Sequence, residues 1–389
     1  MALTQVPNEL LEFGVKTFGT KSIMLGDTTT GTIDAANNNT GVGLDVFESL
    51  STGDDNTAIG KGAMTANTTG GSNVAVGSTA LDANTTGTSN VAVGKGALSG
   101  NTEGDSNVAI GPNALLAATT ADNNVAIGSG AGESITTGDL NIAIGGAALD
   151  ANTTGDRSVA IGYLSLSAQN PSSNTDMYNT AVGHATMASM TTGAQNTAIG
   201  GVAMDKGTTT GNCVAVGYKA LEEVTTGVDN TCVGKGAGAS NTTGQRNVYI
   251  GIEAGNAGTT NSENCLVGRL AGKLNTASST TALGTEALYN NTATGCTGLG
   301  TQSLMANTSG NNNTAAGSSS MVATTTGSEN TGVGRQVMNA LTTGGGNVAM
   351  GYQALATTTS SDHNVSIGFE SGHILTTGGN NTLLGSAAG

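Results

Sequence analysis

The sequence has 389 residues and a net charge of −15, yet only 10% of the residues are charged and 3% are aromatic. So few bulky side chains exclude the thick core of a conventional globular enzyme, while a hydrophobic fraction of 37% excludes a disordered chain. Because 12 Lys and Arg stand against 27 Asp and Glu, and no run of about 18 apolar residues occurs, we predict neither nucleic-acid binding nor membrane insertion.

Residues 1–36 form a segment without repeats, and several of their apolar side chains are large. We single out Leu10, Leu11, Phe13 and Phe18. No basic stretch followed by an apolar stretch opens the chain, so we expect synthesis in the cytoplasm without a secretory signal. Two interpretations of this segment stay open: it attaches the chain to a partner, or it caps the first repeat, since solenoids need capped ends.

Residues 37–389 repeat one motif with a period of 17. The motif reads Asn-Val-Ala-Val-Gly at residues 73–77, and its closing glycine recurs 21 times from Gly43 to Gly385. The step lengthens to 21 before Gly183 and shortens to 16 twice after Gly268. Fixed-length repeats of this kind stack so that each turn pairs with its neighbours. We therefore predict an all-β fold, a parallel β-solenoid of about 21 turns.

Each repeat is expected to hold two short strands and two turns. In the Asn-Val-Ala-Val-Gly run, side chains alternate in direction, so the β-branched residues share one face and the alanine lies on the other. The closing glycine permits a turn conformation that a Cβ would hinder. A second extended segment, such as residues 78–81, then leads to a Thr-Thr-Gly turn.

The asparagine that opens the motif occurs in 17 of the 21 repeats. A catalytic residue would occur once, whereas a residue that stabilises stacking occurs in turn after turn. We predict a structural ladder in which each amide bonds to the turns on either side, while the threonine pairs donate hydroxyls to turn backbone. The asparagine ladder includes Asn56, Asn73, Asn90, Asn107, Asn124, Asn141, Asn196, Asn230 and Asn247.

A leucine or methionine stands four residues after most repeat glycines and forms an apolar stripe. The stripe includes Met64, Leu81, Leu98, Leu115, Leu149 and Leu221. A single thin roll buries few large side chains for each residue that it orders. We expect this stripe, or the Val/Ile stripe of the strands, to pack against identical chains. A parallel homo-oligomer about a rotation axis follows, because every repeat then meets the same neighbour.

The repeated Asn-Val-Ala-Val-Gly and Asn-Val-Ala-Ile-Gly motifs, with Ala-Leu and Thr-Thr-Gly between them, resemble the head repeats of YadA-like trimeric autotransporter adhesins. They resemble more closely the 17-residue arrays of bacteriophage tail fibres. The resemblance covers about Asn37 to Gly389. It implies a left-handed parallel β-roll, a homotrimer with the strands toward the trimer interior, and a fibre that touches a surface.

The missing export signal favours the phage tail fibre over the adhesin. On this interpretation the protein is made in the host cytoplasm and localised in the virion. Residues 1–36 would attach it to a tail or other virion protein, and residues 37–389 would form the shaft. The partner at the host cell would be a surface receptor, either a protein or a glycan.

Two alternative functions stay open, and an enzyme is the least expected class. One alternative is a cell-surface adhesin or filament subunit of the same fold. The other is an ice-binding solenoid, although adjacent threonines in a strand point to opposite faces and do not form one flat surface. No Ser/His/Asp or paired-carboxylate pattern recurs near the three histidines, so we predict no catalytic residues and no metal ligands.

Two further features could contact other molecules. Asp105, Asp122, Asp139 and Asp156 occupy one position on consecutive repeats, where a weak Ca²⁺ site is conceivable and a solvated turn face is the simpler interpretation. We otherwise expect no cofactor.

The four extra residues before Gly183 fall within residues 169–178. This segment predicts a loop with an exposed Met-Tyr pair, and its candidate contact residues are Pro171, Met177 and Tyr178. It is either a contact loop or a tolerated surface insertion.

Overall fold

The computed structural model describes residues 14–26 and 35–389. In these residues the Val-Ala-Val core of the motif forms a short strand in each repeat, because β-branched side chains flank a small buried alanine. Strands of successive turns pair in parallel and in register, so that Val74 lies beside Val91 and Ala75 beside Ala92. The predicted all-β parallel solenoid of about 21 turns is confirmed, and the described residues contain no helix.

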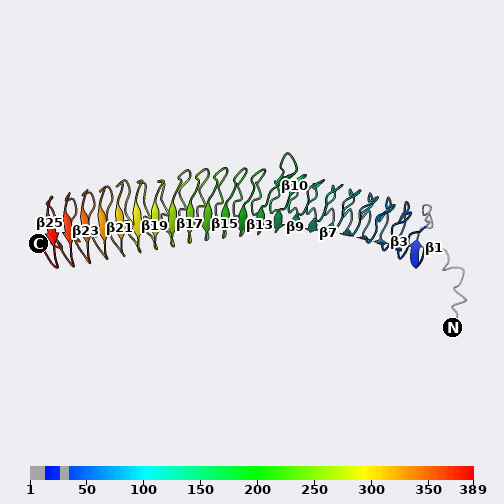
Figure 1. The fold of residues 1–389 in the computed structure, drawn as a ribbon, viewed down its shortest axis with the longest axis horizontal. Coiled ribbons are helices and arrows are strands. Elements are labelled where there is room, and N and C mark those ends of the chain that lie inside the picture. Colours follow the sequence, from blue (N-terminus) through cyan, green and yellow to red (C-terminus); the bar gives the residue numbers. More distant parts are fainter. Residues whose placement is uncertain (1–13, 27–34) are drawn as a thin grey trace, which may run out of the picture. The chain divides into compact units, whose positions relative to one another are not determined.

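The chain divides into two compact units, Met1–Gln195 and Asn196–Gly389. In the first unit, an antiparallel hairpin of β1 and β2 precedes the turns, and β2 pairs in parallel with β3. Each later main strand pairs in parallel with that of the next turn, up to β13 (Figure 1). The strands are β1 Gly14–Phe18, β2 Ser22–Gly26, β3 Thr40–Gly43, β4 Thr57–Ile59, β5 Val74–Val76, β6 Val91–Val93, β7 Val108–Ile110, β8 Val125–Ile127, β9 Ile142–Ile144, β10 Gly155–Asp156, β11 Val159–Ile161, β12 Thr175–Asp176 and β13 Thr180–Val182.

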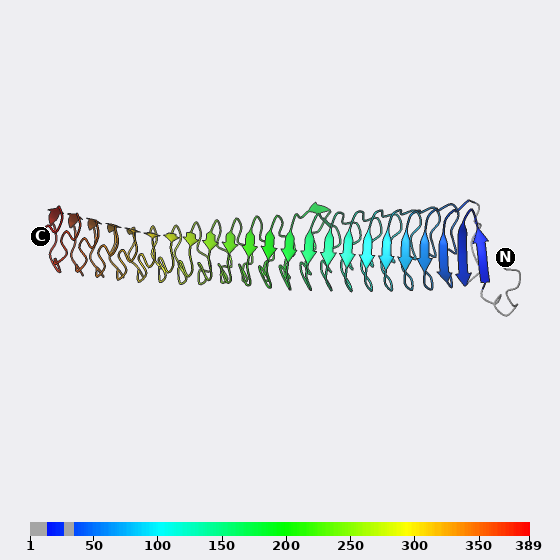
Figure 2. The same ribbon diagram turned by 90° about the horizontal axis from the view of Figure 1, so that it is seen from below.

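The second unit contains one parallel sheet, in which β14 to β25 pair in chain order. Figure 2 shows the strands of each unit side by side, one to a turn. The strands are β14 Thr197–Ile199, β15 Val214–Val216, β16 Thr231–Val233, β17 Val248–Ile250, β18 Cys265–Val267, β19 Thr281–Leu283, β20 Thr297–Leu299, β21 Thr314–Ala316, β22 Thr331–Val333, β23 Val348–Met350, β24 Val365–Ile367 and β25 Thr382–Leu384.

The expected second strand of each repeat is wrong. Residues 78–83 form turns, in which Thr79 and Leu81 have φ angles of 52° and 53°. Backbone N–H groups here donate in alternate directions: Thr79 to the Lys61 carbonyl of the preceding turn at 2.9 Å, and Leu81 to the Ala97 carbonyl of the next turn at 3.0 Å. The segment thus joins its neighbours without being extended, because the chain must reverse within a short repeat.

The leucine and methionine column faces the interior of the roll, so the expectation that it packs against other chains is wrong. Its side chains pack beside the central residues of the strands: a Cβ built on Gly298, at the centre of β20, would lie 3.1 Å from Leu288 Cγ. The left-handed backbone at this position directs the side chain inward. The members Met64, Leu81, Leu98, Leu115, Leu149 and Leu221 are all 0% exposed.

In some turns a large residue at the strand centre is accompanied by a small residue in the Leu/Met column. Tyr249 replaces alanine at the centre of β17, and glycine replaces leucine at residues 238 and 255. A Cβ at Gly238 would lie 2.9 Å from the Tyr249 ring, and one at Gly255 would lie 2.8 Å from it. The ring therefore fills the volume that leucine occupies in other turns, and the interior stays closely packed.

Candidate interaction surface

The first and third residues of the three-residue strands point away from the interior, and we call this surface the strand face. It comprises these two positions in β4–β9, β11 and β13–β25. The central residue is buried in all of these strands except β25, whereas the flanking residues are half-buried or exposed; Ile110 and Ile127 are 38% and 37% exposed. The strand face is present in each unit.

The strand face carries no charged residue, although the chain carries 27 Asp and Glu. Its third position is Val, Ile, Leu, Met or Ala in every one of these strands, and its first position is Val, Ile, Thr or Cys. Soluble proteins rarely expose a long continuous apolar surface unless it binds something. The strand face is therefore the strongest candidate for an interaction with a partner.

The structure places the asparagines of the predicted ladder inside the roll, where they join three turns. The Asn73 amide Nδ2 donates to the Gly87 carbonyl at 2.8 Å, and the Asn73 backbone N–H donates to Asn56 Oδ1 at 3.0 Å. Asn73 Oδ1 in turn accepts the Asn90 N–H at 2.9 Å. The side chain thus satisfies backbone groups that would otherwise be buried without partners.

The other predicted ladder asparagines form the same kind of bonds, and the column has one weaker hydrogen bond, at Cys213. Cys213 takes the place of asparagine between Asn196 and Asn230, and its Sγ accepts the Asn230 N–H at 3.5 Å. The remaining predicted members are Asn56, Asn90, Asn107, Asn124, Asn141 and Asn247, each of which accepts or donates along the same column.

A second asparagine column escaped the sequence analysis. It stands seven residues after the repeat glycine, and Asn84 Nδ2 donates to Asn67 Oδ1 at 2.9 Å and to the Gly87 carbonyl at 3.0 Å. The signal was an asparagine before the Thr-Thr-Gly turn in several repeats. It was obscured because apolar residues such as Leu50 and Ile135, also buried, fill the same position in other turns.

Asn107→Leu is expected to lower the free energy of unfolding by about 2–4 kcal/mol. The change removes two hydrogen bonds: Asn107 Oδ1 accepts the Asn124 N–H at 3.0 Å, and Asn107 Nδ2 donates to the Ala121 carbonyl at 2.6 Å. Both backbone groups would then be buried without a partner. Hydrogen exchange at the Asn124 amide, together with thermal unfolding, measures the effect. Asn339→Leu, at a half-buried position outside the ladder, is the control. An equal and small effect of both variants would contradict the ladder's role.

The threonine pairs bond to the backbone of the next turn. Thr85 Oγ1 donates to the Thr102 carbonyl at 2.9 Å, and Thr102 Oγ1 donates to the Thr119 carbonyl at 3.1 Å. The hydroxyl of the first threonine in these pairs is therefore engaged within the protein.

The acidic column also bonds to backbone. Asp122 Oδ1 accepts the Asp105 N–H and Asp139 Oδ1 accepts the Asp122 N–H, both at 2.7 Å. Burial raises the pKa of Asp156, as does the charge of Asp139; its bond to the Asp139 N–H and nearby Arg157 oppose the shift. Within the described ranges no three His, Cys, Asp or Glu side chains are grouped to hold a metal ion. The calcium interpretation stays a prediction, and these bonds give the column a structural role without a cation.

The inserted loop projects beside β10 (Figure 1), and only part of it is available for contact. The expected exposure of the Met-Tyr pair is wrong for Met177, which is 1% exposed, and Pro171 is buried too. Tyr178 is 51% exposed, and its hydroxyl donates to Asp176 Oδ2 at 3.2 Å. Asp176 also forms an ion pair with Arg157. Pairing of β10 with β12 holds the loop against the preceding turn.

The predicted attachment residues fall mostly outside the described part of the chain. Leu10, Leu11 and Phe13 lie outside the described residues, and Phe18 is the last residue of β1. The β1–β2 hairpin continues the sheet beyond β3 with an antiparallel end. Met24, in β2, is 0% exposed and packs against β3, where a Cβ built on Gly41 would lie 3.2 Å from Met24 Cγ. Whether residues 1–36 attach the chain or cap it stays a prediction.

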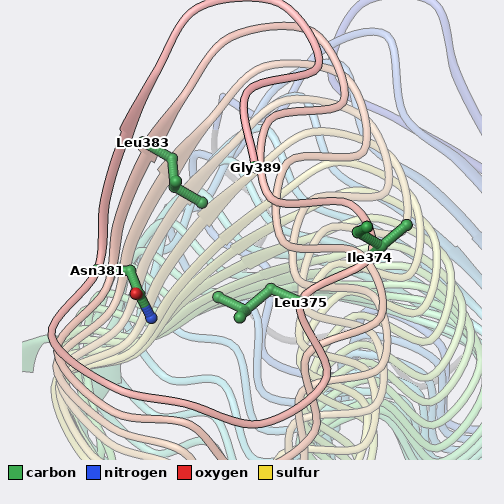
Figure 3. A pocket seen from close by; sticks show the side chains of 5 residues that line it. All are labelled: Ile374, Leu375, Asn381, Leu383 and Gly389. Atoms are coloured by element: carbon green, nitrogen blue, oxygen red, sulfur yellow. The ribbon is translucent and has the colours of Figure 1, made fainter.

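A hollow of about 310 Å³ opens at the last turn (Figure 3). Its lining includes Leu375 and Leu383, which occupy positions that face the interior in other turns. The hollow is thus the inside of the roll at the last described turn.

Comparison with known proteins gives no relative: no family model, no curated protein and no solved structure matches the chain. Among the described residues there is no helix of the length and apolarity that a membrane span requires.

Proposed function

We propose that the chain is the shaft of a fibre, assembled as a parallel homotrimer through the strand face and used by a bacteriophage tail to attach to its host. The observation that carries this proposal is the uncharged strand face, whose third position is apolar in every strand of the face. The Leu/Met column does not need a partner chain, since it is already buried inside the roll. Among the described residues, the strand face is the apolar surface that recurs on turn after turn.

Identical chains in parallel are the partner that this face fits best. Its chemistry repeats once per turn, so an aligned copy meets each turn with the same apolar surface. A shifted copy would leave strands at both ends uncovered. The number three and the left-handed winding rest on the likeness of the repeats to trimeric fibres, which is a fold-level analogy.

In this proposal the protein is structural and adhesive and has no catalytic activity. Residues 1–36 attach it to a tail or other virion protein, and the shaft carries the contact with a host receptor. The ice-binding alternative has less support, because threonines of the strand face alternate with apolar residues and Thr85 bonds within the protein. A cell-surface adhesin would use the same strand face.

Cys265 offers a direct test, because it is the first residue of β18 and lies on the strand face. It is exposed, whereas Cys213, Cys232 and Cys296 are buried, and burial raises the pKa of their thiols. In a parallel trimer the three Cys265 side chains lie at one height near the axis. A short bismaleimide is expected to link chains in the native protein through Cys265.

Cys265→Ser is the matched control and is expected to abolish the linked species. Labelling with a bulky maleimide complements it: the native thiol is expected to react slowly, and the dissociated chain rapidly. Fast labelling of the native protein with no linked chains would contradict assembly through the strand face.

A further inference from the structure

The position directly after each repeat glycine concentrates aromatic and basic residues, and we call it the post-glycine column. It holds 21 of the 389 residues, yet it includes Tyr163, Tyr218, Tyr352 and Phe369 out of 6 tyrosines and 4 phenylalanines. Five of the 12 Lys and Arg stand there too, and none of the 27 Asp and Glu does. Composition alone does not produce such a column, so it points to a specific role.

Three flat groups of this column stack on consecutive turns of the second unit. The Arg335 guanidinium carbon lies 5.9 Å from the centroid of the Tyr352 ring. The Tyr352 and Phe369 rings lie 5.4 Å apart with an angle of 21° between their planes. Such cation–π and aromatic contacts favour this stacked arrangement of the side chains before any ligand arrives. Phe369 is nevertheless 53% exposed.

The outer face of the stack is open. The next member of the column after Phe369 is Ser386, which is exposed and too small to cover a phenyl ring. Phe369 therefore presents an apolar ring to solvent, with the Tyr352 ring stacked on its other side. An exposed, pre-ordered aromatic ring is a surface on which another flat apolar group can stack.

Planar polar side chains run beside the stack, one residue further along each turn. They are Gln336, Gln353 and Glu370, all half-buried. Gln353 Nε2 donates to Gln336 Oε1 at 3.1 Å, which joins two of the three side chains. Amide and carboxylate groups accept hydrogen bonds from hydroxyls, and the amides also donate to them.

We propose that Arg335, Gln336, Tyr352, Gln353, Phe369 and Glu370 form a saccharide-binding strip. The C–H face of a pyranose ring stacks on Phe369, and its hydroxyls bond to Gln353 and Glu370. A glycan chain matches the strip because it alternates apolar C–H faces with hydroxyl groups, and the strip repeats an aromatic or cationic group beside a polar one. This inference rests on the proposed attachment function and names the glycan as its receptor class.

Saturation-transfer NMR on the intact protein tests the strip with defined probes: methyl glycosides of glucose, galactose, mannose and N-acetylglucosamine, and maltohexaose. Saturation is expected to reach ring C–H protons of at least one probe. Phe369→Ala should weaken that binding at least about tenfold. Ile374→Ala removes a side chain that is 75% exposed on the same turn and should leave binding unchanged. Glu370→Gln, which keeps the shape, should weaken binding without changing the fold.

Three results would overturn the strip: no transfer to any probe, equal binding by Phe369→Ala, or a loss of chain association in Phe369→Ala. The last would make the stack a contact between chains. Light scattering on the same samples separates this proposal from the fibre. If the protein is an oligomer that binds no sugar, the fibre proposal stands and the saccharide-binding strip is rejected. If it is a single chain that binds sugar, the strip stands and the fibre proposal is rejected.

Discussion

Gly145→Ala is expected to destabilise the turns around residue 145 by at least about 3 kcal/mol, while Gly146→Ala has little effect. Gly145 has a φ of +131°, and a Cβ there would lie 2.6 Å from the carbonyl oxygen of Gly162 in the next turn. At Gly146 the nearest atom would belong to the Tyr163 ring, at 3.3 Å, and this 56% exposed ring needs to shift by only a few tenths of an ångström. The two variants make the same chemical change at adjacent residues.

Limited proteolysis and hydrogen exchange report this effect better than a single melting temperature, because stacked repeats unfold locally. Cleavage and fast exchange are expected around residues 145–162 in Gly145→Ala alone. If both variants resisted proteolysis equally, the close approach of the glycine backbones would not be the reason that residue 145 is glycine.

The double variant Ile110→Glu/Ile127→Glu is expected to separate the chains without unfolding the solenoid. The two side chains lie on the strand face in adjacent turns and are 38% and 37% exposed in one chain. In a trimer they would bring six carboxylates into an apolar interface, where unpaired buried charge costs several kcal/mol per group. In a single chain the same carboxylates face water and cost little.

Thr120→Glu/Thr137→Glu is the matched control, since it adds the same charge on exposed threonine-pair turns of neighbouring repeats. Light scattering gives the mass, and circular dichroism shows whether the β-structure is retained. The strand-face variant is expected to have the mass of one chain and an unchanged spectrum, and the control to keep the mass of the assembly. If both variants kept the oligomer, another surface would join the chains.

The sequence period was enough to predict the solenoid and to locate the strands and the first asparagine column. A strand of alternating side chains has only two faces, so Val74 and Val76 had to lie opposite Ala75. The direction of Leu81 was not predictable in the same way. Its side chain turns inward because the backbone there is left-handed, and that conformation comes from stacking between turns rather than from the preference of leucine.

The ring stacking in the post-glycine column was not predictable from the sequence either. The sequence places Tyr352 and Phe369 one period apart, but their stacking depends on the pairing of neighbouring turns and on ring orientation. The exposure of Met177 was misjudged because its N–H bonds to the Asp156 carbonyl and fixes it against the preceding turn. Such contacts join residues through the stacked turns and leave no local pattern.

The mass of the intact protein in solution, measured by light scattering, tests trimeric assembly through the strand face most directly. One chain has a mass of 37.8 kDa, and we expect three times this value across a range of protein concentrations. A stable mass of one chain would contradict it, because the strand face would then remain exposed to water on every turn.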